Sequence, residues 1–246
     1  MSLTRRRFLQ SLAGAAGGLM AVPATSRLLH AVDRLHLPRV LRIAHVLPAG
    51  VAGAREKSTT LGFTLGLEEA QHAARLFGIV IEHRAGTDAE PLVREFTPHA
   101  VIGGATQDEC TRLGILAATE GTVFLNVGCS ADILRAAGCR RNVFHVMPSD
   151  AMRRDALAQA NVPSHNADVL LWHESLERYG AGQLNPRFRE RFGTGMDSHA
   201  WAAWMAVKIA AETFFRSKDD SASAFLAALE HELHSKTDSQ NGGSIL

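Results

Sequence analysis

The stretch HAVIGGATQDECTRLGILAATEGTVFLNV, residues 99–127, decides the fold. Residues 99–104 are a short apolar run that predicts a strand, and Gln107 to Thr119 predicts a helix that ends near Gly121. Residues 122–127 are a second apolar run of strand length. Because both strands are almost continuously apolar and a helix separates them, the stretch predicts a βαβ unit whose parallel strands are covered on both faces.

The same alternation continues on both sides of this unit. Further strands are predicted at 41–47, 79–84 and 142–146, and further helices at 58–77 and 151–160. Gly78 closes the first of these helices, and Ser149 or Asp150 is the expected N-cap of the second. Right-handed crossovers join these elements into a Rossmann-like domain over residues 40–160. The predicted fold class is therefore α/β, with a doubly wound parallel sheet.

The remainder of the chain is predicted to be mostly helical. Only residues 168–172 have the composition of a strand, and a break is expected at Pro186. The helical stretch 197–215 carries an aromatic stripe that includes Trp201 and Trp204. Such a stripe is typical of a core, but if it lacks cover it becomes an exposed apolar patch that favours self-association. The other expected segments are helices at 175–192 and 222–234 and a disordered tail at 235–246.

Two loops carry the candidate binding residues. Ligands of doubly wound sheets bind beyond the carboxyl ends of the strands. The loop at residues 103–107 reads GGATQ and the loop at residues 127–131 reads VGCSA. Their glycines allow a close approach of backbone to ligand, and their hydroxyls can bind a polar group. The same composition is equally typical of tight turns with N-caps. The candidate ligand-binding residues are Gly104, Thr106, Gly128 and Ser130.

The N-terminus predicts an export signal. Three arginines precede the small apolar run Phe8 to Val22, which is too short to span a membrane, and Ala24 follows at a position suited to cleavage. The pattern Thr-Arg-Arg-x-Phe-Leu at residues 4–9 resembles the twin-arginine signal, although Gln10 stands where that signal prefers lysine. Residues 1–24 are therefore expected to be removed near Ala24 after export to the periplasm. The residues that carry this signal are Arg5, Arg6, Phe8 and Leu9.

Composition and motifs exclude several functions. Removal of residues 1–24 takes away three arginines and no acid, so the formal net charge falls from +1 to −2 and leaves no basic stripe for nucleic acid. His231 and His234 lack the spacing of a zinc site on one helix face. The chain has no dinucleotide fingerprint, no Walker A run and no G-x-S-x-G elbow. No catalytic residue, metal or cofactor is predicted. Cys129 as a nucleophile lacks an identifiable histidine partner, and three cysteines leave at least one thiol unpaired.

Several segments in order resemble the type I periplasmic substrate-binding proteins of ABC importers. They are LRIAHVLPAGVAG, VIGGATQDE, VFLNVGCSADILR and RRNVFHVMPSDAMRRDALAQ. With LERYGAGQLNPRF and WAAWMAVKIAAE, they are similar to the subfamily associated with pyrroloquinoline quinone-dependent alcohol dehydrogenase systems. The resemblance implies a small-molecule ligand held in a cleft between two lobes, by Thr106 and by the Gly128–Ser130 loop. It also implies a partnership with the membrane subunits of an importer.

The chain departs from this family because residues 161–234 supply only a partial, mostly helical second lobe. Half a site offers few hydrogen bonds against the cost of association, so we expect affinity of about millimolar or weaker. The predicted function is capture of a small polar or carboxylate-bearing solute for import, and the shortened second lobe also fits a degenerate copy. Two alternatives stay open: a non-catalytic interaction module, and an exported enzyme without a recognisable cofactor motif.

Overall fold

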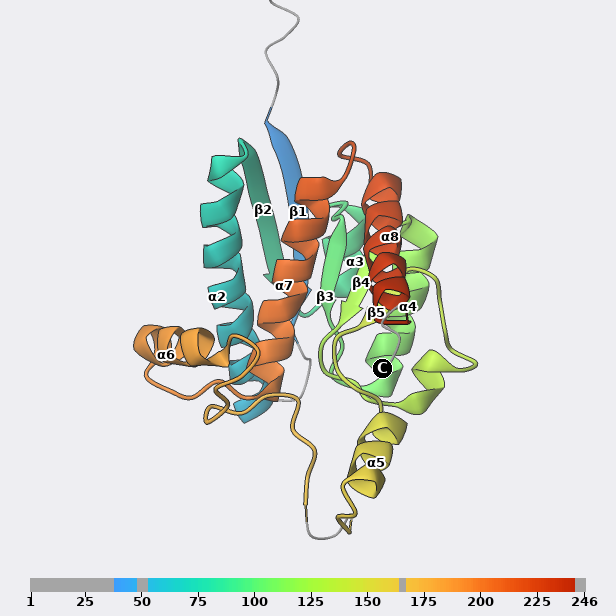
Figure 1. The fold of residues 1–246 in the computed structure, drawn as a ribbon. Helices are drawn as coiled ribbons and strands as arrows, with labels where there is room; N and C mark the ends of the chain where they lie inside the picture. The colour runs from blue at the N-terminus through green and yellow to red at the C-terminus, as the bar shows by residue number, and fades with distance from the viewer. Residues whose placement is uncertain (1–37, 48–52, 164–166, 242–246) are drawn as a thin grey trace, which may run out of the picture. The chain divides into compact units, whose positions relative to one another are not determined.

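The computed structural model describes residues 38–47, 53–163 and 167–241 (Figure 1). The predicted export signal, residues 1–24, lies outside the described residues, as do residues 48–52. All described residues belong to one compact unit that begins at Pro38.

A parallel sheet of five strands forms the centre of this unit, with the order β2-β1-β3-β4-β5. All four neighbouring pairs are parallel, which confirms the predicted α/β class. The order reverses between β1 and β3, and this is the point at which ligands of doubly wound sheets bind. The strands are β1 (Arg39–Val46), β2 (Ile79–Gly86), β3 (Ala100–Gly103), β4 (Val123–Asn126) and β5 (Val143–His145).

The strands alternate their side chains between two buried faces. Leu41 and Ile43 of β1 belong to the cluster on one face, whereas Ala44 and Val46 belong to the cluster on the other. Helices cover both faces, as the near-continuous apolar strands require. The first face is covered by α2 (Ala54–Leu76), α7 (Ser198–Arg216) and α8 (Ala222–Asn241), and the second by α3 (Ala89–Arg94) and α4 (Gln107–Glu120). The remaining helical elements are η1 (Asp132–Arg135), α5 (Asp150–Gln159) and α6 (Ala181–Phe192).

Helices α2 and α7 lie side by side and run in the same direction (Figure 1). At their first turns the Ser58 hydroxyl donates to Asp197 Oδ2 at 2.6 Å. At their far ends the rings of Phe77 and Phe215 lie with centroids 5.1 Å apart. Both helices therefore present their N-termini at the same edge of the sheet. This is the carboxyl edge, because α2 follows the end of β1.

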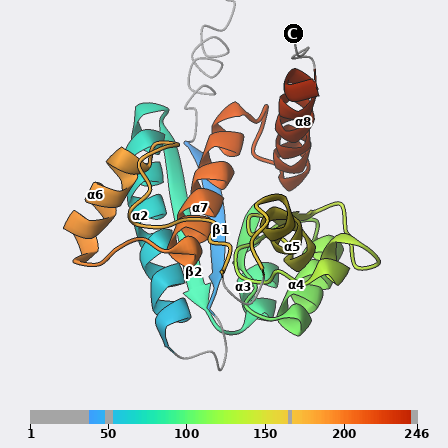
Figure 2. The same ribbon diagram turned by 60° about the horizontal axis from the view of Figure 1, so that its bottom comes forward.

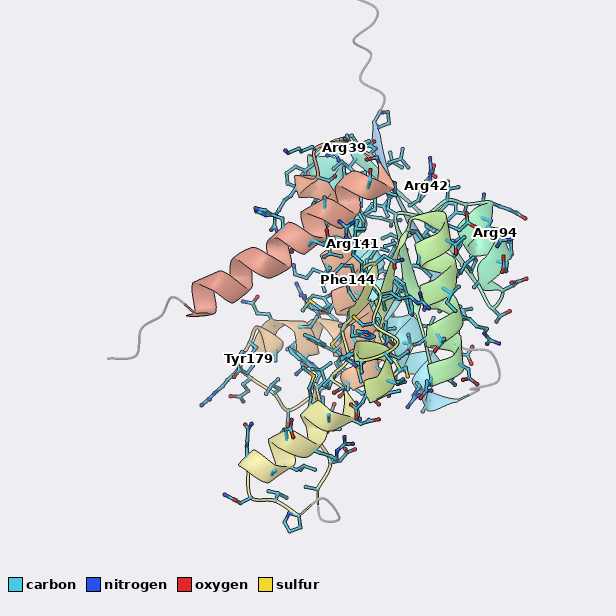
Figure 3. All side chains as sticks on the ribbon, turned by 90° about the vertical axis from the view of Figure 1, so that its right-hand side faces the viewer. Arg39, Arg42, Arg94, Arg141, Phe144 and Tyr179 are labelled. Carbon is cyan, nitrogen blue, oxygen red and sulfur yellow. The ribbon has the colours of Figure 1, made fainter. Side chains whose placement is uncertain are left out.

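The start of β1 fixes the other end of α7. The Arg39 guanidinium donates to Phe214 O at 3.2 Å and to Ser217 Oγ at 2.8 Å, and it pairs with Asp220 at 2.6 Å. Figure 3 shows Arg39 beside the end of this helix. The segment 161–234, which the sequence predicts as a partial second lobe, thus places α7 and α8 against the sheet of residues 39–145.

The aromatic stripe of α7 is core. Trp204 is 8% exposed and Phe214 is fully buried. Trp201 stacks on Trp172 with ring centroids 5.4 Å apart, and Phe188 of α6 packs in the same cluster as Trp204. Figure 2 shows α6 beside α2 and α7. The expectation of an uncovered patch on this stripe is therefore wrong, because α2, α6 and the loop before α6 cover it.

Four local predictions differ from the structure. Residues 168–172 form no strand, because Leu171 N and Trp172 N donate to Ser198 Oγ at 3.0 and 3.1 Å and tie this segment to α7. Helix α6 begins only at Ala181 and continues through Pro186 without a break. Helix α8 extends past Ser235 to Asn241, into the stretch predicted to be disordered. The sequence patterns missed α3, which Asp88 caps by accepting from Glu90 N at 3.1 Å.

Candidate ligand site at the carboxyl edge of the sheet

The loops after β3 and β4 touch each other at their glycines. Gly104 has a φ of +90°, which favours glycine, and a Cβ placed on Gly128 would lie 2.4 Å from Gly104 O. The two glycines line a cavity of only about 10 Å³, together with Arg55 and Thr59 of α2. The two glycines are small because the two loops contact each other there. The cavity that they line is too small for a solute.

Thr106 caps α4, as the sequence predicts. Its Oγ1 accepts from Glu109 N at 3.2 Å. The Glu109 carboxylate in turn accepts from Ala105 N at 2.8 Å. The N-terminus of α4 therefore already holds a carboxylate of this chain, which occupies the kind of site that a ligand anion would take.

Thr106 also lines a larger cavity of about 480 Å³ between α3 and α4. The rim of this cavity carries three carboxylates, from Asp88, Glu90 and Glu109, and two guanidinium groups, from Arg94 and Arg112. Arg94 is itself paired with Glu90 and Glu120, both at 3.1 Å. This excess of carboxylates makes the cavity a poor site for an anionic solute.

Asn126, at the end of β4, organises the second loop. It is fully buried, and its Oδ1 accepts from Gly128 N at 3.2 Å and from Cys129 N at 3.0 Å. Its Nδ2 donates to Cys129 O at 2.7 Å and lies 2.9 Å from His145 Nδ1. The backbone N–H groups of Gly128 and Cys129 are therefore bound within the protein rather than free for a ligand. The asparagine inside the otherwise apolar run VFLNV is the sequence feature from which this role could have been predicted.

Ser130 does not repeat the arrangement of Thr106. The 3₁₀ helix η1, rather than an α-helix, follows this loop, and its N-cap is Ala131 without a side-chain cap. The Ser130 carbonyl accepts from Asp150 N at 2.9 Å, which links the loop to the start of α5. Thr106 lines the larger cavity, Gly104 and Gly128 line the smaller one, and Ser130 lines neither. Neither of these two cavities, both lined by described residues, contains all four predicted binding residues.

Three basic side chains that sequence reasoning missed interact at the same edge. We call Arg55 of α2, Arg153 of α5 and His199 of α7 the basic cluster. The pKa of His199 is lowered, first by burial and then by the positive charge of Arg55; the Asp197 carboxylate opposes this shift, and Arg153 adds a smaller lowering. His199 Nδ1 and Arg153 Nε are buried and have no hydrogen-bond partner among the described residues. Buried polar groups are nearly always paired, so Arg153 Nε calls for an acceptor and His199 Nδ1 calls for a partner that matches its tautomer.

The nearest carboxylate is already committed. Asp197 caps α7, because its Oδ1 accepts from His199 N at 3.0 Å and from Ala200 N at 2.9 Å. Its Oδ2 accepts from the Ser58 hydroxyl. The basic cluster therefore keeps an excess of positive charge beside the carboxyl ends of the strands. An anion bound there would satisfy unpaired donors and would raise the pKa of His199 again.

A second buried imidazole belongs to the core. His45 of β1 is 2% exposed and stacks on Phe63 with ring centroids 4.2 Å apart. Burial, followed by the neighbouring His83, lowers the pKa of His45 to about 4. The native state therefore holds His45 neutral at pH values at which the unfolded chain would protonate it.

This shift predicts a loss of stability in mild acid. Between the unfolded pKa of 6.5 and the folded pKa of about 4, the unfolded state binds more protons, so stability falls as the pH falls. Acidification from pH 6.5 to about pH 5 should cost about 2 kcal/mol through this group alone. Urea unfolding across this range checks the prediction. His45→Phe should flatten the dependence and the exposed His72→Phe should not; equal slopes in the two variants would contradict it.

The described part of the chain shows neither a metal centre nor a membrane span. No group of three or more His, Cys, Asp and Glu side chains among these residues could hold a metal ion. No helix within the same residues is both long and apolar enough to cross a membrane.

Comparisons with known proteins identify relatives of the fold. No protein-family model matches the chain, and no curated protein sequence matches it. One similar solved structure is the branched-chain amino acid transporter substrate-binding protein of Streptococcus pneumoniae in complex with isoleucine. It is 11% identical to this chain, with a TM-score of 0.62, and the match covers 77% of this chain and 87% of that one. A substrate-binding protein of Desulfitobacterium hafniense in complex with Leu is 13% identical, with a TM-score of 0.60 and coverages of 78% and 88%.

A solute-binding protein of Rhodopseudomonas palustris in complex with benzoate gives a similar match, with 11% identity, a TM-score of 0.62 and coverages of 78% and 85%. All three are described as substrate- or solute-binding proteins of ABC transporters or amino acid transporters. At these identities the likeness concerns the fold alone. The chain has an α/β fold whose five-stranded parallel sheet resembles a lobe of the type I periplasmic binding proteins.

Proposed function

We propose that this protein is a solute-binding component of an ABC importer and that it captures a small carboxylate-bearing molecule. The observation that carries the proposal is the basic cluster, in which Arg153 Nε and His199 Nδ1 are buried without a partner. It lies on elements that meet at the carboxyl edge of the sheet, where doubly wound folds bind ligands. Isoleucine, leucine and benzoate, which are bound by the similar structures, each carry a carboxylate.

The setting of this function is part of the proposal. The twin-arginine pattern at Arg5 and Arg6 supports export to the periplasm, and membrane subunits of an importer would receive the solute. The resemblance to the subfamily linked to alcohol dehydrogenase systems supports an acid produced by alcohol oxidation as one ligand. The short segment after residue 160 supports the view that this protein has lost part of its second lobe. Closure of two lobes over the ligand would then be impaired.

The expected affinity is weak. A charge-assisted hydrogen bond contributes about 1.5–3 kcal/mol net, and the basic cluster offers two or three of them. Association costs on the order of 4–15 kcal/mol in lost freedom. Because one lobe leaves the ligand partly in water, we expect a Kd of about 1 mM for benzoate or leucine. Sub-micromolar binding by a monomer would contradict the one-lobe site.

Calorimetric titration of two neighbouring variants tests the site. Arg153→Ala should weaken binding of benzoate by at least about tenfold, because it removes the unpaired donor. Arg154→Ala changes the net charge equally but removes an exposed side chain that pairs with Asp132 at 2.9 Å. It should leave the affinity within about twofold. Benzamide, which lacks the charge, should not bind, and equal effects of the two variants would refute the proposal.

A second candidate function is an interaction module. Helix α5 has no buried residue, and Met152 on it and Leu170 after it are 57% and 56% exposed. Tyr179, before α6, is 86% exposed and points away from the sheet (Figure 3). These exposed side chains are candidates for contact with a second copy of the chain, and they are separate from the buried stripe of α7. Light scattering during the same titrations distinguishes the two functions. If the protein remains a monomer at all concentrations, self-association is disfavoured and solute binding is the better account.

A further inference from the structure

Two buried cysteines meet around the side chain of Asn126. The Cys110 thiol, in the first turn of α4, donates to Asn126 Oδ1 at 3.4 Å. The same oxygen accepts from Cys129 N at 3.0 Å, and Asn126 Nδ2 donates to Cys129 O. Cys110 and Cys129 are 2% and 6% exposed and belong to one apolar cluster. The solute-binding function proposed above uses neither thiol.

The side chain of Cys129 also affects the pKa of the Cys110 thiol. Burial raises the pKa of the Cys110 thiol, and so do the charge and a side-chain hydrogen bond of Cys129. Cys139, the third cysteine, is exposed and lies beyond η1. Cys129 and Cys139 are the closest pair in the sequence, but the fold brings Cys110 and Cys129 to the same side chain, that of Asn126.

We propose that Cys110 and Cys129 form a dithiol that closes to a disulfide and fastens α4 to the loop after β4. This bond would join the first turn of the helix capped by Thr106 to the loop that carries Gly128. It would stabilise the protein mainly by constraining the unfolded chain between residues 110 and 129. The three cysteines of the structure are thiols, so the structure represents the reduced form.

The oxidant is an external disulfide, either of a small molecule or of a protein dithiol oxidase. The thiolate of one cysteine attacks this disulfide, which gives a mixed disulfide and releases one external thiol. The second cysteine then attacks the sulfur of the first, forms the Cys110–Cys129 bond and releases the second external thiol. The two cysteines lose two electrons and two protons, and one external disulfide becomes two thiols.

Burial sets the rate of this reaction. Cys110 lines a cavity of about 30 Å³ with His145, which is too small to admit glutathione. Oxidation of the folded protein therefore requires the loop after β4 to open, whereas refolding exposes both thiols. We expect oxidation during refolding to be faster than oxidation of the native chain.

The test uses the full chain with Cys139→Ser, which leaves only the proposed pair. After refolding with oxidised glutathione, the protein should lose two hydrogen atoms by intact mass. Maleimide adducts formed in denaturant should fall from two to none. The melting temperature should rise by about 6–12 °C over the reduced form. The matched control, Cys129→Ser in the same background, should form no internal disulfide and show no rise in melting temperature. If the Cys129→Ser protein does not fold, Cys110→Ala serves as the control instead.

Three outcomes would overturn the proposal. The first is that both thiols remain free after refolding with the oxidant. The second is that peptide mapping of the unmodified chain finds Cys139 in the internal bond. The third is that the Cys110–Cys129 bond forms but lowers the melting temperature. None of these outcomes depends on solute binding, so they are independent of the proposed function.

Discussion

Gly62→Ala should lower the free energy of unfolding by about 3 kcal/mol, the upper end of what overpacking usually costs. A Cβ on Gly62 would lie 1.9 Å from Ala200 O and 2.7 Å from Ala200 Cα. These are backbone atoms of α7, so no side chain can rotate out of the way. The better helix propensity of alanine, about 1 kcal/mol, is smaller than this clash. Urea unfolding followed by circular dichroism measures the difference.

Gly182→Ala is the matched control for that substitution. Gly182 also lies in a helix, α6, but the nearest atom to its added Cβ is Glu177 O at an ordinary 3.5 Å. Only the change in backbone entropy then remains, and we expect a gain of about 0.5 kcal/mol. If Gly62→Ala were as well tolerated as Gly182→Ala, the close contact of α2 and α7 would be wrong. The positions of Arg55 and His199 would then be wrong as well, because this contact brings their helices together.

Asn126→Ala is the second substitution with a large expected effect, a loss of about 3 kcal/mol. The side chain is fully buried, and its removal leaves Gly128 N, Cys129 N and Cys129 O without partners. A buried polar group without a partner costs about 1–3 kcal/mol. Some of this cost is recovered if the loop opens to water. Thermal and urea unfolding should both show the loss.

The opening of the loop has a chemical signature. In the Asn126→Ala variant, maleimide should react with Cys129 without denaturant, whereas in the parent chain only the exposed Cys139 should react quickly. Ser130→Ala in the same loop is the control, since the described contacts of Ser130 are made by its backbone. It should change stability by less than about 0.5 kcal/mol. An Asn126→Ala protein as stable as Ser130→Ala would show that the asparagine does not hold the loop.

The sequence predicted the sheet well because strand and helix signals are local. The apolar runs around Ile43, Ile102 and Leu125 are short and β-rich, and each is followed by turn residues. Caps were equally readable, since Thr106 and Ser149 each bond a backbone N–H within three residues of themselves. One failure has a cause that is not local. Residues 168–172 have the composition of a strand, but a hydroxyl of α7 takes up their backbone groups.

By itself, the sequence determined the α/β class, the parallel strands, the caps of α4 and α5 and the absence of a recognisable cofactor motif. Only the tertiary structure decided which side chains meet. It placed Arg55, Arg153 and His199 at one edge, brought Cys110 and Cys129 to the side chain of Asn126, and used Gly104 and Gly128 for loop contact. The physical reason is that caps and periodicity depend on neighbours within a few residues. Charge clusters, thiol pairs and helix crossings instead depend on packing between segments far apart in the chain, which no local pattern records.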